Sequence, residues 1–217
     1  MLLTEKNSGY QRGTEQWLGF LKCWQATGEA ELIRFEGNTV NEKIKPSAGV
    51  SLPNSVKDFY QAYALLSGQF VEPQSDEVGL FQPENIVTLV EYSADLQTAL
   101  QAWPATSDDE AYYTYGVEQD TATSRTSNYA GALVLGRFGQ FPEEIILLYP
   151  NSLTADGEYE TAILSHAYEF RTPSFAEMMR QLSILETEKK DLMPPYSYQE
   201  SLNYCSALLA LRDVWWK

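Results

Sequence analysis

The chain has few residues of the types that carry out covalent catalysis, and they stand isolated from one another. Its one histidine, His166, lies in an apolar stretch, and the sequence has no G-x-S-x-G turn of the kind that exposes a nucleophilic serine. A Ser-His-Asp or Cys-His device needs the histidine within hydrogen-bond reach of its nucleophile. No motif supplies that partner, so we interpret His166 as a structural or surface residue and expect no catalytic residues.

Metal ions and nucleotides also lack a sequence motif. Zinc requires about four cysteine or histidine ligands in close pairs, which one histidine and the distant Cys23 and Cys205 do not provide. The run Asp108-Asp109-Glu110 lacks the spacing and the glycine of a calcium-binding loop. Glycine-rich phosphate-binding sequences are missing as well. The sequence therefore predicts no metal site and no cofactor.

Carboxylates leave one enzymatic alternative open. Glycosidases need only two carboxylates, about 5 to 9.5 Å apart across an open cleft. Because the chain has 30 Asp and Glu residues, some pair is inevitable and carries little information. A carboxylate-dependent hydrolase is therefore the third of three hypotheses, and the lack of catalytic motifs favours a binding protein over an enzyme.

The charge of the chain is its most informative property. Fifteen Lys and Arg residues stand against 30 Asp and Glu, which gives a net charge of -15. A surface this acidic repels nucleic-acid phosphates and anionic lipid headgroups, and it attracts basic proteins. We therefore expect no direct contact with nucleic acid or membrane, and a basic protein as the partner.

The acidic residues are unevenly distributed. Between Lys57 and Arg125 there is no basic residue, whereas this stretch carries twelve carboxylates. One interpretation is a solvated acidic face; the functional alternative is a docking surface whose tyrosines serve as interface anchors. For the docking surface we predict a first cluster and a second cluster, namely Asp108, Asp109, Glu110, Tyr112, Tyr113, Glu118 and Asp120, then Glu72, Asp76 and Glu77.

Cysteine usage and hydropathy bear on the cellular compartment. Cys23 and Cys205 both lie in apolar helical patterns, and such sparse use of cysteine suits a reducing compartment. The sequence leaves a disulfide between them as an open alternative, but we expect two free, buried thiols. Residues 1–17 lack the apolar core of a secretory signal, and no apolar run is long enough to span a bilayer. The expected protein is cytoplasmic and monomeric.

Periodicity predicts helices at both ends of the chain and strands between them. Apolar spacing indicates helices over residues 14–28, 53–67, 83–92 and 94–103, and again from Thr172 and from Ser197. Alternation indicates strands over residues 77–81, 112–117, 132–138, 144–149 and 161–170. Helices, then consecutive strands, then helices are typical of an α+β fold with an antiparallel sheet. We expect a single domain over residues 1–217.

Three segments together resemble the SUKH superfamily, which joins yeast cell-wall-assembly regulators with bacterial toxin-immunity proteins. The first is Leu52-Pro53-Asn54-Ser55-Val56-Lys57-Asp58-Phe59-Tyr60, similar to the family's LPxSxKxFY helix start. The second is Gly79-Leu80-Phe81 followed by Pro83-Glu84-Asn85-Ile86, and the third is Thr172-Pro173-Ser174-Phe175-Ala176-Glu177-Met178-Met179, similar to a closing SFxEFL helix. Ser67-Gly68 stands where the family usually has Asn-Gly. The resemblance covers about residues 40–185.

The resemblance implies a twisted antiparallel sheet flanked by helices, with the N- and C-terminal helices as additions. It also implies, for a bacterial member, an immunity protein that binds and neutralises a toxin of a toxin–antitoxin or contact-dependent inhibition system, often a basic nuclease. For a eukaryotic member it implies a non-catalytic regulatory or scaffold protein. The family's partner surface varies among its members, so the acidic clusters above rest on charge alone.

Overall fold

The computed structural model describes residues 3–10, 13–28, 51–66, 78–165, 168–187 and 203–209. Within these ranges the centre of the molecule is a six-stranded antiparallel sheet with the order β1-β3-β4-β5-β6, in which β2 also pairs with β3. Its strands are β1 (Gly79–Leu80), β2 (Val87–Thr88), β3 (Leu133–Arg137), β4 (Ile145–Leu153), β5 (Tyr159–Ser165) and β6 (Tyr168–Thr172).

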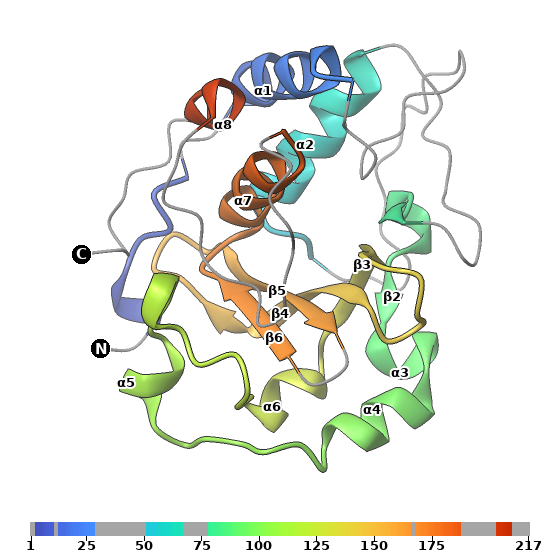
Figure 1. Ribbon diagram of the computed structural model, residues 1–217, viewed down its shortest axis with the longest axis vertical. Helices are drawn as coiled ribbons and strands as arrows, with labels where there is room; N and C mark the ends of the chain where they lie inside the picture. Colours follow the sequence, from blue (N-terminus) through green and yellow to red (C-terminus); the bar gives the residue numbers. More distant parts are fainter. Residues whose placement is uncertain are drawn as a thin grey trace.

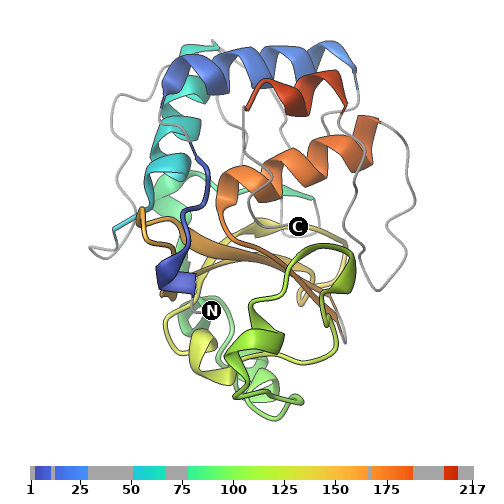
Figure 2. The ribbon, with the colours of Figure 1, turned by 90° about the vertical axis from the view of Figure 1, so that its left-hand side faces the viewer.

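Helices lie on both faces of the sheet (Figures 1 and 2). The longer ones gather on one face together with α8, namely α1 (Thr14–Ala26), α2 (Asn54–Leu65), α7 (Phe175–Thr187) and α8 (Tyr204–Ala207). Short helices and connecting segments cover the other face, namely α3 (Leu89–Tyr92), α4 (Ala94–Leu100), α5 (Asp109–Tyr112) and α6 (Thr126–Tyr129). Three 3-10 helices complete the described elements: η1 (Leu3–Glu5), η3 (Pro83–Asn85) and η4 (Gly116–Glu118). This is an α+β fold, as the sequence predicts.

Both faces of the sheet are buried because its central strands are apolar on both sides. On β4, Ile146 and Leu148 pack with α1, α2 and α7, whereas Ile145 and Leu147 belong to a second core beneath the sheet. Successive side chains of a strand point to opposite faces, so an unbroken apolar run supplies two cores at once. The upper core is rich in aromatic residues, with Trp17 in edge contact with Phe59 at a ring-centroid distance of 5.2 Å.

Gly136 allows β1 to approach β3. A Cβ atom at this position would lie 2.4 Å from the carbonyl oxygen of Gly79, closer than any real contact. The register of β3 against β4 also shifts between Val134 and Gly136. A side chain here would separate β1 from the sheet.

The structure confirms several predicted elements. Helices occupy Thr14–Ala26, Asn54–Leu65, Ala94–Leu100 and Phe175–Thr187, and β3 and β4 occupy the two predicted hairpin strands. A capping bond fixes the start of α7, since Ser174 Oγ accepts from the backbone N–H of Glu177 at 3.2 Å. The last predicted helix is described only over α8.

Other predictions of local structure are wrong. Residues 112–117 are not a strand but the end of α5 followed by η4. The stretch 161–170 contains parts of two strands, because β5 ends at Ser165 and β6 begins at Tyr168. The predicted helix 83–92 divides into η3, the short strand β2 and α3. His166 lies outside the described residues.

Over the part of the chain that the structure describes, no helix is long and apolar enough to cross a membrane.

Candidate partner-binding surface

The first predicted cluster lies in a segment that runs across the lower face of the sheet. We call residues 108–129 the acidic segment; it contains α5, η4 and α6. Asp108 begins α5 as its N-cap, where its carboxylate accepts from the backbone N–H groups of Glu110 at 2.9 Å and Ala111 at 3.3 Å. Such capping satisfies donors that have no partner within the helix. The sequence Asp108-Asp109-Glu110 thus starts a helix and still exposes the side chains of Asp108 and Glu110.

Asp109 is paired and therefore differs from its neighbours. Its carboxylate accepts a hydrogen bond from the guanidinium of Arg125. Arg125 also lies over the rings of Tyr112 and Tyr113, 4.8 and 5.0 Å from their centroids. Arg125 is the residue that ends the stretch without basic residues, and here it cancels one charge of the predicted surface.

The predicted role of Tyr112 as a surface anchor is wrong. Its side chain is 1 % exposed, and its hydroxyl donates to Glu160 at 3.1 Å. Tyr115 is buried as well, and Tyr113 is half-buried. Alternation within the sequence could not reveal this, because Tyr112 is turned inward by a helical turn and not by a strand.

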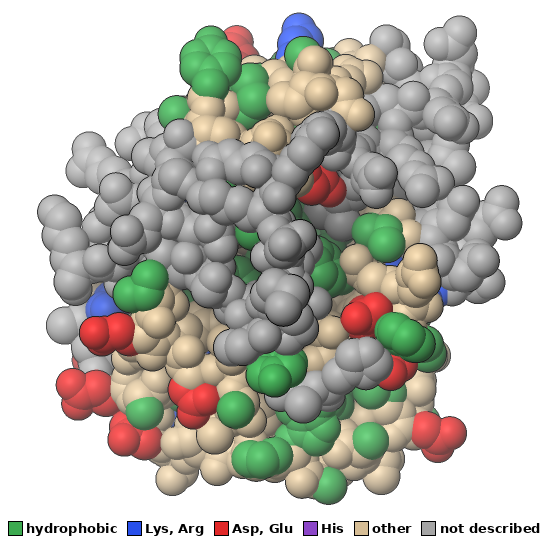
Figure 3. All heavy atoms as spheres, viewed as in Figure 1, with side chains coloured by type: hydrophobic (Ala, Val, Ile, Leu, Met, Phe, Trp, Pro, Cys, Tyr) green, Lys and Arg blue, Asp and Glu red, His purple; other side chains and the backbone are tan. Residues whose placement is uncertain are grey.

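The remaining predicted residues are exposed and belong to the same acidic segment. Glu118 and Asp120 follow α5, and between Tyr115 and Glu118 the apolar side chain of Val117 is 68 % exposed. Figure 3 shows acidic side chains gathered at the corner of the molecule where α5 lies. We call this surface the acidic corner and define it by five residues, namely Asp108, Glu110, Val117, Glu118 and Asp120. The sequence-based prediction missed Val117. The one feature that could have pointed to it is its position as an apolar residue between Gly116 and Glu118.

Asp120 has a local structural role in addition to its charge. Its carboxylate accepts from the hydroxyl of Thr123 at 2.6 Å and from the backbone N–H of Ala122 at 2.9 Å. The hydrogen bond from the Thr123 hydroxyl lowers the pKa of this carboxyl, together with the backbone bonds and the nearby guanidinium of Arg171. Asp120 therefore stays ionised and fixes the turn that follows the acidic corner.

The second predicted cluster, Glu72, Asp76 and Glu77, lies outside the described residues. The structure describes the first cluster completely and brings four of its seven members to the corner's surface.

Beneath the acidic segment lies a buried group of charged and hydroxyl-bearing side chains. Glu160 of β5 and the pair Glu169 and Arg171 of β6 are 0 to 1 % exposed. Arg171 Nη1 lies 3.7 Å from Glu160 Oε1. Glu169 accepts from the hydroxyls of Tyr149 at 2.5 Å and Tyr129 at 3.5 Å. We call Glu160, Glu169 and Arg171 the buried charge cluster.

Burial changes the protonation of the two carboxyl groups in this cluster. The pKa of Glu169 is raised to about 7, because desolvation outweighs the opposing attraction of Arg171 and the hydrogen bond from Tyr149. Burial also raises the pKa of Glu160, against the effect of Arg171 and of the hydroxyls of Tyr115 and Tyr112. One guanidinium thus interacts with two carboxyl groups that are both buried away from solvent.

The buried charge cluster does not have the geometry of a hydrolase site. A glycosidase pair faces an open cleft that admits a sugar and a water molecule. Glu160 and Glu169 are covered by tyrosines, and at 0 and 1 % exposure neither can meet a substrate in this structure. Within the described ranges, no group of three or more His, Cys, Asp or Glu side chains is placed to hold a metal ion.

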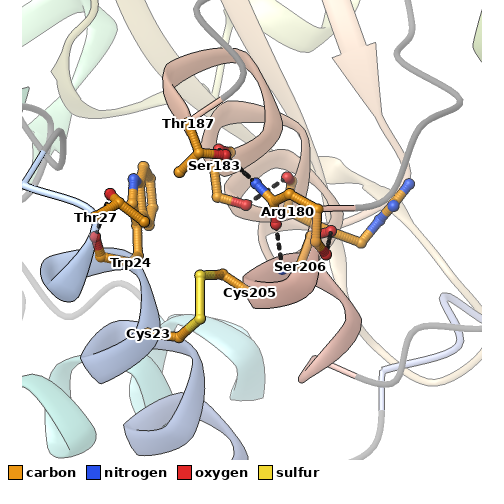
Figure 4. The surroundings of a disulfide bond; sticks show 9 residues. Cys23, Trp24, Thr27, Arg180, Ser183, Thr187, Cys205 and Ser206 are labelled. Carbon is orange, nitrogen blue, oxygen red and sulfur yellow. Dashed lines mark hydrogen bonds between the residues drawn. A yellow bond between two sulfur atoms is a disulfide. The ribbon is translucent and has the colours of Figure 1, made fainter.

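The two cysteines are joined, which corrects the expectation of free thiols. A disulfide links Cys23 of α1 to Cys205 of α8, with Cα atoms 5.3 Å apart and a sequence separation of 182 (Figure 4). Asn203, the N-cap of α8, adds a second tie by donating to the carbonyl of Ser183 at 2.8 Å. A groove of ≈ 660 Å³ runs beside the disulfide between α1 and α8.

No family model, curated protein or solved structure matches this chain.

Proposed function

We propose that this protein works by binding a basic protein through the acidic corner, and that the partner is a toxin which it neutralises as an immunity protein. The observation that carries the binding proposal is the corner itself, where one short segment exposes four carboxylates and a valine. Charged groups around a small apolar centre are the usual composition of a protein interface. The immunity role rests on the SUKH-like segments, and the class of nuclease toxin rests on that resemblance together with the net charge of -15.

Charge complementarity explains how such a surface would find its partner. Long-range attraction raises the association rate of oppositely charged proteins, and it weakens as salt screens the charges. A nuclease binds the phosphates of its substrate through basic residues, so an acidic corner can occupy the same surface. The regulatory or scaffold alternative would use the same corner with a different basic partner.

The experiment is a pull-down of the tagged protein from its own cells at low salt, with the bound proteins identified by mass spectrometry. We expect one basic toxin domain, encoded beside this protein, that is lost from the Glu110→Lys/Glu118→Lys variant. The control is Glu84→Lys, because Glu84 is an exposed acid of η3 far from the corner. Recovery of cell-wall or signalling proteins instead would support the scaffold, and equal recovery by all three proteins would remove the corner as the site.

A further inference from the structure

The acidic segment cannot hold its shape through its own secondary structure. Its three helices, α5, η4 and α6, have only four, three and four residues. Helices this short are unstable in water, because nucleation fixes several residues for each hydrogen bond that forms. The positions of the corner's side chains must therefore be set by contacts between this segment and the sheet.

Arg171 on β6 supplies a large part of these contacts. Its Nη1 donates to the backbone carbonyl of Tyr112, its Nη2 donates to the carbonyl of Asp120 at 2.9 Å, and its guanidinium lies 3.8 Å from the centre of the Tyr112 ring. The side chain of Gln119 also accepts from the backbone N–H of Arg171 and donates to its carbonyl, both at 2.7 Å. One residue thus holds both ends of the stretch that carries Val117 and Glu118.

The two carboxyl groups of the buried charge cluster hold further parts of the segment. Glu160 accepts from the hydroxyl of Tyr115 at 2.7 Å and from the side-chain amide of Asn128 at 3.3 Å. The carboxylate of Glu169 accepts from the hydroxyl of Tyr129 at 3.5 Å, and its backbone N–H donates to the carbonyl of Thr121 at 2.9 Å. The ends and the middle of the acidic segment are therefore all bonded to β5 and β6.

The charges inside this arrangement do not balance when both carboxyl groups are ionised. Glu169 faces ionisable groups from every element around it, namely Tyr149 of β4, Glu160 of β5, Arg171 of β6, Tyr112 of α5 and Tyr129 of α6. Arg171 is the one cation among them. Ionisation of Glu169 would add a second buried negative charge beneath a surface that is already acidic, which favours local opening toward water.

We propose that the buried charge cluster is a positioning device for the acidic corner, and that a proton on Glu169 tightens it, so that the order of the segment and its affinity for a basic partner fall as pH rises. The first half of this proposal stands on the contacts alone. The effect on affinity rests on the proposed function. The pKa of about 7 for Glu169 supports a transition within the physiological range.

The test is amide hydrogen exchange of the full chain at pH 5.5 and pH 8, corrected for the intrinsic exchange rates. Protection of residues 108–129 is expected to fall by about tenfold between the two values, since opening lets Glu169 ionise as it would in water. Glu169→Gln, which mimics the protonated side chain, should keep the higher protection at both values. Protection of β3, β4 and β5 reports global unfolding, and it is the reference against which the local loss in the acidic segment is compared.

Two further variants separate positioning from general stability. Glu158→Gln changes another buried carboxyl, which bonds to Ser55 of α2 and not to the acidic segment, so its protection profile over residues 108–129 should match the parent protein. Gln119→Ala removes the two bonds to the Arg171 backbone and should lower protection at both pH values while keeping the pH dependence. A parent protein whose segment shows no pH dependence, or a Glu169→Gln variant with the parent's dependence, would overturn the proposal.

A binding measurement distinguishes this proposal from the proposed function. With a basic partner in hand, affinity should be lower at pH 8 than at pH 5.5 for the parent protein and equal at both values for Glu169→Gln. Equal pH dependence in both proteins would overturn the coupling to binding. If no basic partner binds at all, the proposed function fails, while hydrogen exchange still decides whether the cluster positions the segment.

Discussion

Tyr112 and Tyr113 are neighbours in sequence, yet the structure gives them different roles. The hydroxyl of Tyr112 donates to buried Glu160 and accepts from Asn128 at 3.0 Å, whereas that of Tyr113 lies in a half-buried position 3.4 Å from Ser152. A buried carboxylate that loses a donor retains the desolvation cost of its charge. The contribution of each tyrosine to stability therefore depends on how deeply its hydroxyl is buried. The composition of the chain and the spacing of its residues do not reveal this.

Substitution of the two tyrosines tests this difference. Tyr112→Phe should lower the free energy of unfolding by about 1–3 kcal/mol, because it leaves Glu160 and Asn128 each short of a partner. Tyr113→Phe is the matched control and should change it by less than about 0.5 kcal/mol. Urea denaturation followed by tryptophan fluorescence measures both. Equal losses in the two variants would contradict the role assigned to Tyr112.

The raised pKa of Glu169 predicts how the global stability of the protein depends on pH. Its pKa is about 7 in the folded protein and near 4.5 in an unfolded chain, so the folded state binds the extra proton. The resulting stabilisation is complete below about pH 4.5 and is lost as pH rises through about 7. The difference in unfolding free energy between the parent protein and Glu169→Gln should therefore shift in favour of the variant from pH 5 to pH 8. A difference that is constant over this range would show that Glu169 does not titrate there.

At the scale of elements, the sequence predicted structure well where one physical cause dominates. Strands β3 and β4 follow from their apolar runs, and α2 follows from its apolar stripe and Pro53 as N-cap. It failed at residues 165–168, where the change from β5 to β6 has no glycine, proline or asparagine to mark it. It also failed at residues 112–117, because tyrosines that bury against the sheet from a short helix mimic the alternation of a strand.

The disulfide belongs to this scale because it joins α1 to α8. Four-residue α8 packs against α1 and α7 and lies near the end of the chain's described part. Joining residues with a sequence separation of 182 restricts the unfolded chain, so the double variant Cys23→Ser/Cys205→Ser should lose about 2–5 kcal/mol of stability in denaturant unfolding. If reducing the disulfide of the parent protein lowers its stability by the same amount, the loss in the variant is caused by the missing bond. Unchanged stability in the variant would contradict the tie.

The same bond gives a prediction about the compartment. Disulfides persist in oxidising compartments and are rare in the cytosol, so the argument for the cytoplasm from free thiols no longer applies. Protein captured from its own cells with thiols blocked at lysis should carry no blocking group on Cys23 or Cys205. Blocking groups on both residues would restore the cytoplasmic expectation.

At the scale of the whole molecule, the fold class and the acidic character were predictable, whereas the organisation of the surface was not. Sequence patterns give elements and their order, and the count of charges gives the sign of the surface. They do not show that Arg125 neutralises Asp109, that Tyr112 turns inward, or that Arg171 joins residues 112 and 120. The first fact is a contact between side chains 16 positions apart, and the other two depend on contacts of strands β5 and β6 with a segment some fifty residues earlier. No local pattern encodes them.

The central claim is that the acidic corner binds a basic protein. Its most direct test is calorimetric affinity for the purified partner across a range of salt concentrations, comparing the parent protein, Glu110→Lys/Glu118→Lys and Glu84→Lys. The account predicts that affinity falls with salt for the parent and for Glu84→Lys, and that the double variant binds at least about tenfold more weakly with a reduced salt dependence. Equal affinities and equal salt dependence for all three proteins would contradict it.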